Sequence, residues 1–145
     1  MTSKERLERL IVVMEEVEAQ HKAFSIRTWM SAPKNKDLTE CGTTCCAAGY
    51  AALDPMLQAE GLQLVSWDGN TIIKTKADFL NLSKESAEGV VYPTYKFSTY
   101  FAALADFFGI LIRDSEYLFS PYSYTEKYVT PSSVIQHIYR VLGRA

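Results

Sequence analysis

The sequence predicts a mostly helical α+β fold, in which four to five helices surround one core and a single β-hairpin lies near residues 62–75. Three observations indicate this class. Both terminal stretches carry apolar residues at helical spacing, an Asp-Gly pair separates two apolar runs in the middle, and 145 residues suit one hydrophobic core. We therefore expect a single globular domain spanning 1–145.

The first predicted helix covers residues 2–20. Thr2 and Glu5 have the spacing of a capping box, in which each side chain accepts from the other residue's backbone N–H. The apolar residues that recur every three or four positions are Leu7, Leu10, Ile11, Met14 and Val17. This pattern is typical of a helix that buries one face.

A second helix is expected from near Thr43 to Leu53, and Asp54-Pro55 is an N-cap and first-turn pair that restarts it. Residues 62–75 then place Asp68-Gly69 between two runs rich in Leu, Val and Ile, which indicates a hairpin. An isolated hairpin is marginally stable in water, so we expect it to rest on helices or to gain a strand from residues 90–95.

Two further helices are predicted in the last third of the chain. One runs from Phe97 to Phe108 and stops at Gly109, and the other opens with Thr130-Pro131 and ends before Gly143. Between them we expect irregular chain, apart from one turn starting at Asp114.

Composition and charge argue against several function classes. Hydrophobic residues make up 48% and the net charge is −2, so no general basic field is present to hold nucleic acid. The longest apolar run, residues 100–112, contains Asp106 and is too short to span a bilayer. No phosphate-binding glycine loop, dinucleotide fingerprint or HExxH motif occurs. We expect a soluble cytoplasmic protein without a cofactor and without membrane contact.

All three cysteines lie between positions 41 and 46, and Cys41 is a candidate nucleophile. It precedes a predicted helix, whose N-terminal N–H groups would stabilise a thiolate. The local Cys-Gly pair before a small-residue helix resembles the nucleophile segment of papain-like peptidases of the bacteriocin-processing kind. Such an enzyme needs a general base, and His137 is the only histidine downstream.

Two other interpretations of the cysteines remain. Cys41 and Cys45 with His21, and His137 as a fourth ligand, would make a zinc site if the fold brought them together, because structural zinc takes four such ligands. Small thiols on a helix face also let a neighbouring helix approach closely, and buried structural cysteines are the ordinary case. We favour this packing role, with no metal bound.

Several short motifs along the chain occur together in a fixed order. They are Phe24-Ser25-Ile26 with Trp29, Cys41-Gly42-Thr43-Thr44-Cys45-Cys46-Ala47-Ala48-Gly49, Phe108-Gly109-Ile110, Leu118-Phe119-Ser120-Pro121 and Thr130-Pro131. In this order they resemble a group of small uncharacterised phage and bacterial proteins. Tyr50 stands where that group often has histidine. The resemblance implies a phage or prophage origin and carries no chemistry over.

Aromatic residues gather between the two last predicted helices. The candidate partner-binding residues are Tyr117, Phe119, Tyr122, Tyr124 and Tyr128. Tyrosine is enriched at protein interfaces, yet these rings would serve equally well as a roof over the core. Stacking on single-stranded nucleic acid would require more Lys and Arg than this region supplies.

These observations favour a non-catalytic accessory factor that binds a protein. The partner would be a host protein, in the host cytoplasm, if the chain is phage-encoded, and a homodimer is the other form such an interface takes. The competing hypothesis is a cysteine-dependent hydrolase or transferase of papain-like type that uses Cys41 with His137.

Overall fold

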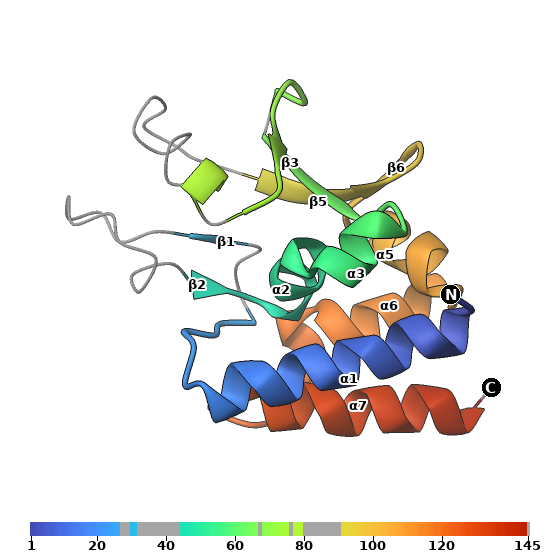
Figure 1. Ribbon diagram of the computed structural model, residues 1–145. Helices are drawn as coiled ribbons and strands as arrows, with labels where there is room; N and C mark the ends of the chain where they lie inside the picture. Colours follow the sequence, from blue (N-terminus) through green and yellow to red (C-terminus); the bar gives the residue numbers. More distant parts are fainter. Residues whose placement is uncertain (27–29, 32–43, 67, 76, 80–90, 145) are drawn as a thin grey trace.

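The two helices at the ends of the chain lie side by side. The computed structural model describes residues 1–26, 30–31, 44–66, 68–75, 77–79 and 91–144. In it α1 (Ser3–Ala19) and α7 (Pro131–Arg144) run antiparallel (Figure 1). Ser132 Oγ donates to both carboxylate oxygens of Glu18, at 2.6 and 2.8 Å, where the end of α1 meets the start of α7.

The sequence explains how both terminal helices begin. The predicted capping box of α1 is confirmed, because Thr2 Oγ1 accepts from the Glu5 N–H at 3.1 Å and Glu5 Oε1 accepts from the Thr2 N–H. Thr130 caps α7 in the same manner, since its Oγ1 accepts from the Ser133 N–H at 3.3 Å. Each cap satisfies N–H groups that a helix start would otherwise leave without partners.

The helix that follows the cysteines starts later than predicted. Thr44–Cys45 forms strand β2, which pairs antiparallel with β1 (Met30–Ser31), and α2 covers Ala47–Leu53. Cys45 also accepts a hydrogen bond from the Ser25 N–H at 3.1 Å. These pairings hold its backbone extended, so the predicted start near Thr43 is wrong and Cys46 is the N-cap.

Asp54 restarts the helix as predicted. It caps α3 (Pro55–Ala59) by accepting from the Leu57 N–H at 3.2 Å, while Arg9 of α1 donates to its two oxygens at 3.0 and 2.7 Å. One buried carboxylate therefore fixes α3 and joins it to α1.

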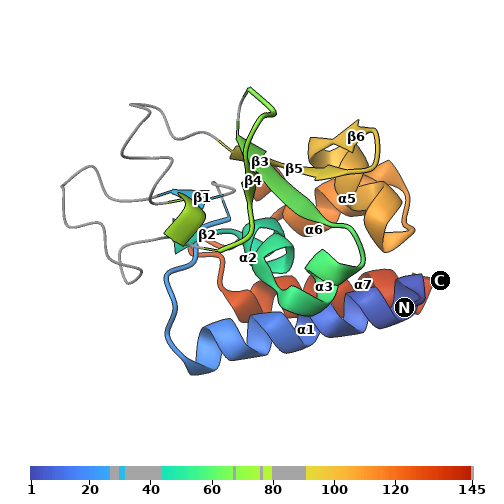
Figure 2. The same cartoon turned by 45° about the horizontal axis from the view of Figure 1, so that its top comes forward.

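The predicted hairpin is confirmed and belongs to a larger sheet. β3 (Gln63–Ser66), β4 (Ile72–Ile73), β5 (Val91–Tyr95) and β6 (Ser98–Thr99) are antiparallel, in the order β4-β3-β5-β6. In the turn, Asp68 Oδ1 accepts from Ser66 Oγ and the Asn70 N–H, and Gly69 has a φ of 79°. β5 is the additional strand expected from residues 90–95. Figures 1 and 2 place this sheet on one side of α2 and α3, with α1 and α7 on the other.

Two predictions for the last third of the chain are wrong. Phe97 does not begin a helix but is fully exposed at the β5–β6 turn, and α5 runs from Tyr100 to Phe108. A further helix, α6 (Ile112–Phe119), occupies chain expected to be irregular. Its buried Ser115 donates to the Phe101 carbonyl oxygen at 2.8 Å. This hydrogen bond allows a polar residue, of a type common in turns, to lie in the protein interior.

The core draws on nearly every element described above. Its largest fully buried side chains come from both halves of the chain and include Leu10, Met14, Leu57, Leu64, Phe79, Phe107, Phe108 and Phe119. The mostly helical α+β prediction is thus confirmed. Within the described residues, no helix has the length and apolar character that crossing a membrane requires.

Candidate functional site

His137 lies between two tyrosine rings at the centre of the predicted aromatic region. Tyr117 from α6 and Tyr124 from the segment after it both stack on the imidazole ring of His137. Each tyrosine ring centroid lies 4.0 Å from that of His137, and each tyrosine ring is nearly parallel to the imidazole. The histidine is 5% exposed. Stacking on both tyrosines restricts the orientation of the imidazole ring.

Hydrogen bonds fix the same three residues. His137 Nδ1 lies 2.9 Å from the Tyr117 carbonyl oxygen, which can only accept, so Nδ1 carries a proton. Arg140 Nη1 donates to the Tyr117 hydroxyl oxygen at 2.9 Å. The Tyr124 hydroxyl donates to the Leu118 carbonyl oxygen at 2.7 Å, and burial raises the pKa of that hydroxyl. The arrangement therefore clamps the chain that leaves α6 onto α7.

The chain between α6 and Tyr124 is held by hydroxyl groups. The 3₁₀ turn η2 (Pro121–Ser123) starts after Ser120, whose Oγ accepts from the Tyr122 N–H at 3.3 Å. Ser123 Oγ donates to the carbonyl oxygens of Tyr117 and Ser120, at 2.7 and 2.8 Å. Tyr122 thus projects from a turn whose two flanking serines both bond to backbone.

The five predicted partner-binding residues divide between interior and surface. Phe119 and Tyr124 are buried in the core and offer no surface, and Tyr117 is half-buried in the histidine stack. Tyr122 and Tyr128 are 90% and 77% exposed. The region is therefore both core roof and exposed surface, with the two roles alternating along one segment.

Cys45 and Cys46 are buried in the hydrophobic core, which is where a packing role requires them to lie. Both have almost no exposed surface, and burial raises the pKa of the Cys46 thiol to about 11. A thiol that stays protonated and shielded from solvent is a poor nucleophile. Cys41, the candidate nucleophile, lies outside the described residues, so its pairing with His137 stays a prediction.

The candidate zinc ligands do not assemble where the structure describes them. His21 is exposed just beyond the end of α1, with a φ of 50°, whereas Cys45 is fully buried. Within the described ranges, no group of three or more His, Cys, Asp or Glu side chains is placed to hold a metal ion.

Sequence reasoning missed the histidine stack itself. The sequence predicts His137 only as a candidate general base or as a fourth zinc ligand, and neither role involves the tyrosines. The dense tyrosines just upstream were the available signal, but pairing them with His137 required knowing that α6 returns the chain to α7.

Comparison with known proteins adds no further constraint. No protein-family model matches the chain, and neither do curated proteins or solved structures.

Proposed function

We propose that this chain is a non-catalytic binding protein and that it docks on a partner protein through Tyr122 and Tyr128. The observation that carries the proposal is the contrast along residues 119–128. Two large aromatic side chains face solvent, while Phe119 and Tyr124 between and before them are buried.

The hydrogen bonds around this segment favour binding. An interface residue on a loose loop must be ordered when the partner arrives, and that ordering weakens the complex. Here the serine bonds and the Tyr124 hydrogen bond fix the backbone of residues 120–124, which carries Tyr122, in advance. Tyrosine suits the role because it provides a large contact area with few rotatable bonds, and it is enriched among residues that dominate binding energy.

The charges nearby favour a protein over a polyanion. Lys127 Nζ lies 5.5 Å from the centroid of the Tyr128 ring, and Glu126 precedes it, so the two charges of the segment have opposite signs. Nucleic acid binding depends on several cations acting together. The resemblance to phage proteins would make the partner a host protein, and a second copy of the chain is the other protein that this surface suits.

The test compares binding by matched tyrosine variants. The double variant Tyr122→Ser, Tyr128→Ser removes both exposed rings, while Tyr139→Ser removes an aromatic ring that is 60% exposed on α7. Affinity capture from cells that naturally contain the protein identifies the partner, and titration then measures each variant. Sedimentation of the protein alone tests self-association.

We expect the double variant to lose at least about 30-fold in affinity, because two aromatic interface anchors commonly contribute that much. Tyr139→Ser should bind like the unmodified protein. Equal affinities for all three proteins would refute the proposed surface, as would a partner whose binding depends on Cys41 and not on the tyrosines.

A further inference from the structure

A groove lies between α3 and the β3–β4 hairpin, and it takes no part in the proposed function. Its volume is about 360 Å³, near the lower end of the roughly 300–1,000 Å³ that is typical of ligand pockets. At about 30 Å³ per water-sized atom, it has room for on the order of ten heavy atoms. That size suits a small organic molecule.

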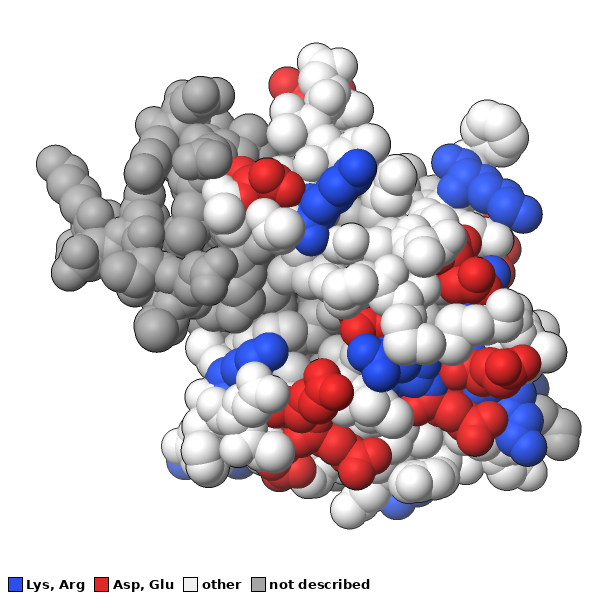
Figure 3. Space-filling view, viewed as in Figure 1, with Lys and Arg blue, Asp and Glu red and all other residues white. Residues whose placement is uncertain are grey.

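The groove is lined by both apolar and polar side chains. Its accessible apolar surface comes from Pro55 and Ala59 of α3 and from Ile72 of β4, which are exposed, whereas Ala52, Leu62 and Ile73 border the groove but are almost fully buried. Space-filling Figure 3 shows that charged side chains of both signs crowd over α1, whereas the area over α2, α3 and β3 is mostly uncharged.

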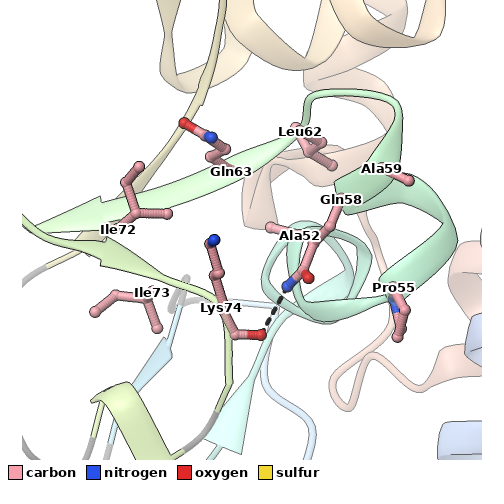
Figure 4. Close-up of a pocket in the computed structure, with 9 residues that line it drawn as sticks. All are labelled: Ala52, Pro55, Gln58, Ala59, Leu62, Gln63, Ile72, Ile73 and Lys74. Carbon is pink, nitrogen blue, oxygen red and sulfur yellow. Dashed lines mark hydrogen bonds between the residues drawn. The ribbon is translucent and has the colours of Figure 1, made fainter.

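Lys74 contributes a positive charge to the groove. The register that pairs Leu64 with Ile73 places Gln63 opposite Lys74, so both side chains lie on the same face of the hairpin. Figure 4 shows the Lys74 side chain directed into the space that the labelled residues enclose. Gln58 Nε2 donates to the Lys74 carbonyl oxygen at 2.7 Å, which ties the end of the hairpin to α3.

The nearest acidic residue in sequence does not neutralise this lysine. Asp78 Oδ2 accepts from the backbone N–H groups of Lys74 and Thr75, at 3.0 and 3.1 Å. None of the ion pairs formed by the described residues involves Lys74. With no carboxylate of the described residues paired to it, its ammonium group can bind an anion in the groove.

We infer that this groove binds a small aliphatic carboxylate. The carboxylate would pair with the Lys74 ammonium group and the Gln63 amide, and the aliphatic part would cover the exposed Pro55, Ala59 and Ile72. A single ammonium group matches a singly charged anion, whereas a phosphate group usually draws on several cations or backbone N–H groups. The exposed apolar side chains favour a ligand with a hydrocarbon body over a simple inorganic anion.

Titration with hexanoate, followed by ¹H–¹⁵N NMR of the full chain, tests this inference. Acetate lacks the hydrocarbon body, and hexylamine carries the opposite charge. Lys74→Gln removes the charge from an exposed side chain, Ala59→Phe fills the groove from an exposed helix position, and Lys22→Gln is a matched control on another surface.

We expect hexanoate to cause saturable shifts at the amides of Gln58, Leu62 and Lys74, while acetate and hexylamine cause none. Lys74→Gln should weaken binding by about fivefold, as loss of one exposed ion pair does. Ala59→Phe should abolish binding, and Lys22→Gln should leave it unchanged. Absence of saturable shifts, equal binding of hexylamine, or full affinity in Lys74→Gln would overturn the inference. Because Tyr122 and Tyr128 take no part in it, neither result bears on the proposed protein interface.

Discussion

Removing one hydroxyl group at Tyr124 tests how firmly the aromatic segment is clamped. The Tyr124 hydroxyl donates at 2.7 Å to the Leu118 carbonyl oxygen near the end of α6, and the side chain is 8% exposed. Tyr124→Phe keeps the ring and its stack on His137. A buried hydrogen bond contributes about 1 kcal/mol, and leaving its acceptor unsatisfied adds to the cost. We expect the free energy of unfolding to fall by about 1.5 kcal/mol.

Urea denaturation measures this difference, provided that the m-value stays constant between variants. Tyr122→Phe is the matched control, because that tyrosine is 90% exposed and its hydroxyl should matter by less than about 0.5 kcal/mol. Hydrogen exchange at the amides of residues 122–124 should accelerate in Tyr124→Phe alone. If the two variants are equally stable, the clamp does not hold the segment and the reasoning about preorganisation fails.

Three further predictions concern other parts of the fold. Asp54→Ala removes the cap of α3 and the ion pair with Arg9, so the free energy of unfolding, measured by urea denaturation, should fall by about 2–3 kcal/mol. Asp54→Asn keeps the cap and should lose clearly less. Gly109 has a φ of 64°, and a Cβ atom added there would overlap the Ser3 side chain, so Gly109→Ala should lower the melting temperature. Adding Ser3→Gly should partly restore it. Cys45 and Cys46 should resist alkylation at pH 8 until the protein unfolds, because both are buried. Stability should decline as the pH rises from about 9 through 11, because the Cys46 thiol ionises at lower pH in the unfolded chain than in the folded protein. Rapid labelling of either thiol in the native protein would contradict their burial.

Local signals in the sequence predict the elements whose ends are set by neighbouring residues. Thr2 with Glu5, Asp54 before Pro55, Asp68 before Gly69 and Thr130 before Pro131 each act within three residues, and all four mark the boundary or turn that they predict. Interactions of this range do not depend on the rest of the fold.

Elements decided by distant partners could not be predicted in the same way. Cys45 is extended because it pairs with Met30, and small residues such as those around it otherwise favour a helix. Ser115 lies inside α6 because the Phe101 carbonyl oxygen accepts its hydroxyl. Phe97 lies in a tight turn, where Lys96 has a φ of 54°, and apolar spacing alone does not reveal that turn.

The candidate site shows the same division. Composition identified the tyrosine-rich segment, and exposure then separates Tyr122 and Tyr128 from the buried Tyr124. The partner of Tyr124 in the stack, His137, comes from another element, so no local pattern joins the two.

Photo-crosslinking at Tyr122 tests the proposed interface most directly. Tyr122→benzoylphenylalanine places a photoreactive ring at the exposed turn, and Tyr139→benzoylphenylalanine places the same ring on α7 as the control. After irradiation in cells that naturally contain the protein, we expect one discrete protein adduct from position 122 and none of that mass from position 139. Adducts of equal yield from both positions, or none from position 122, would contradict the proposed interface.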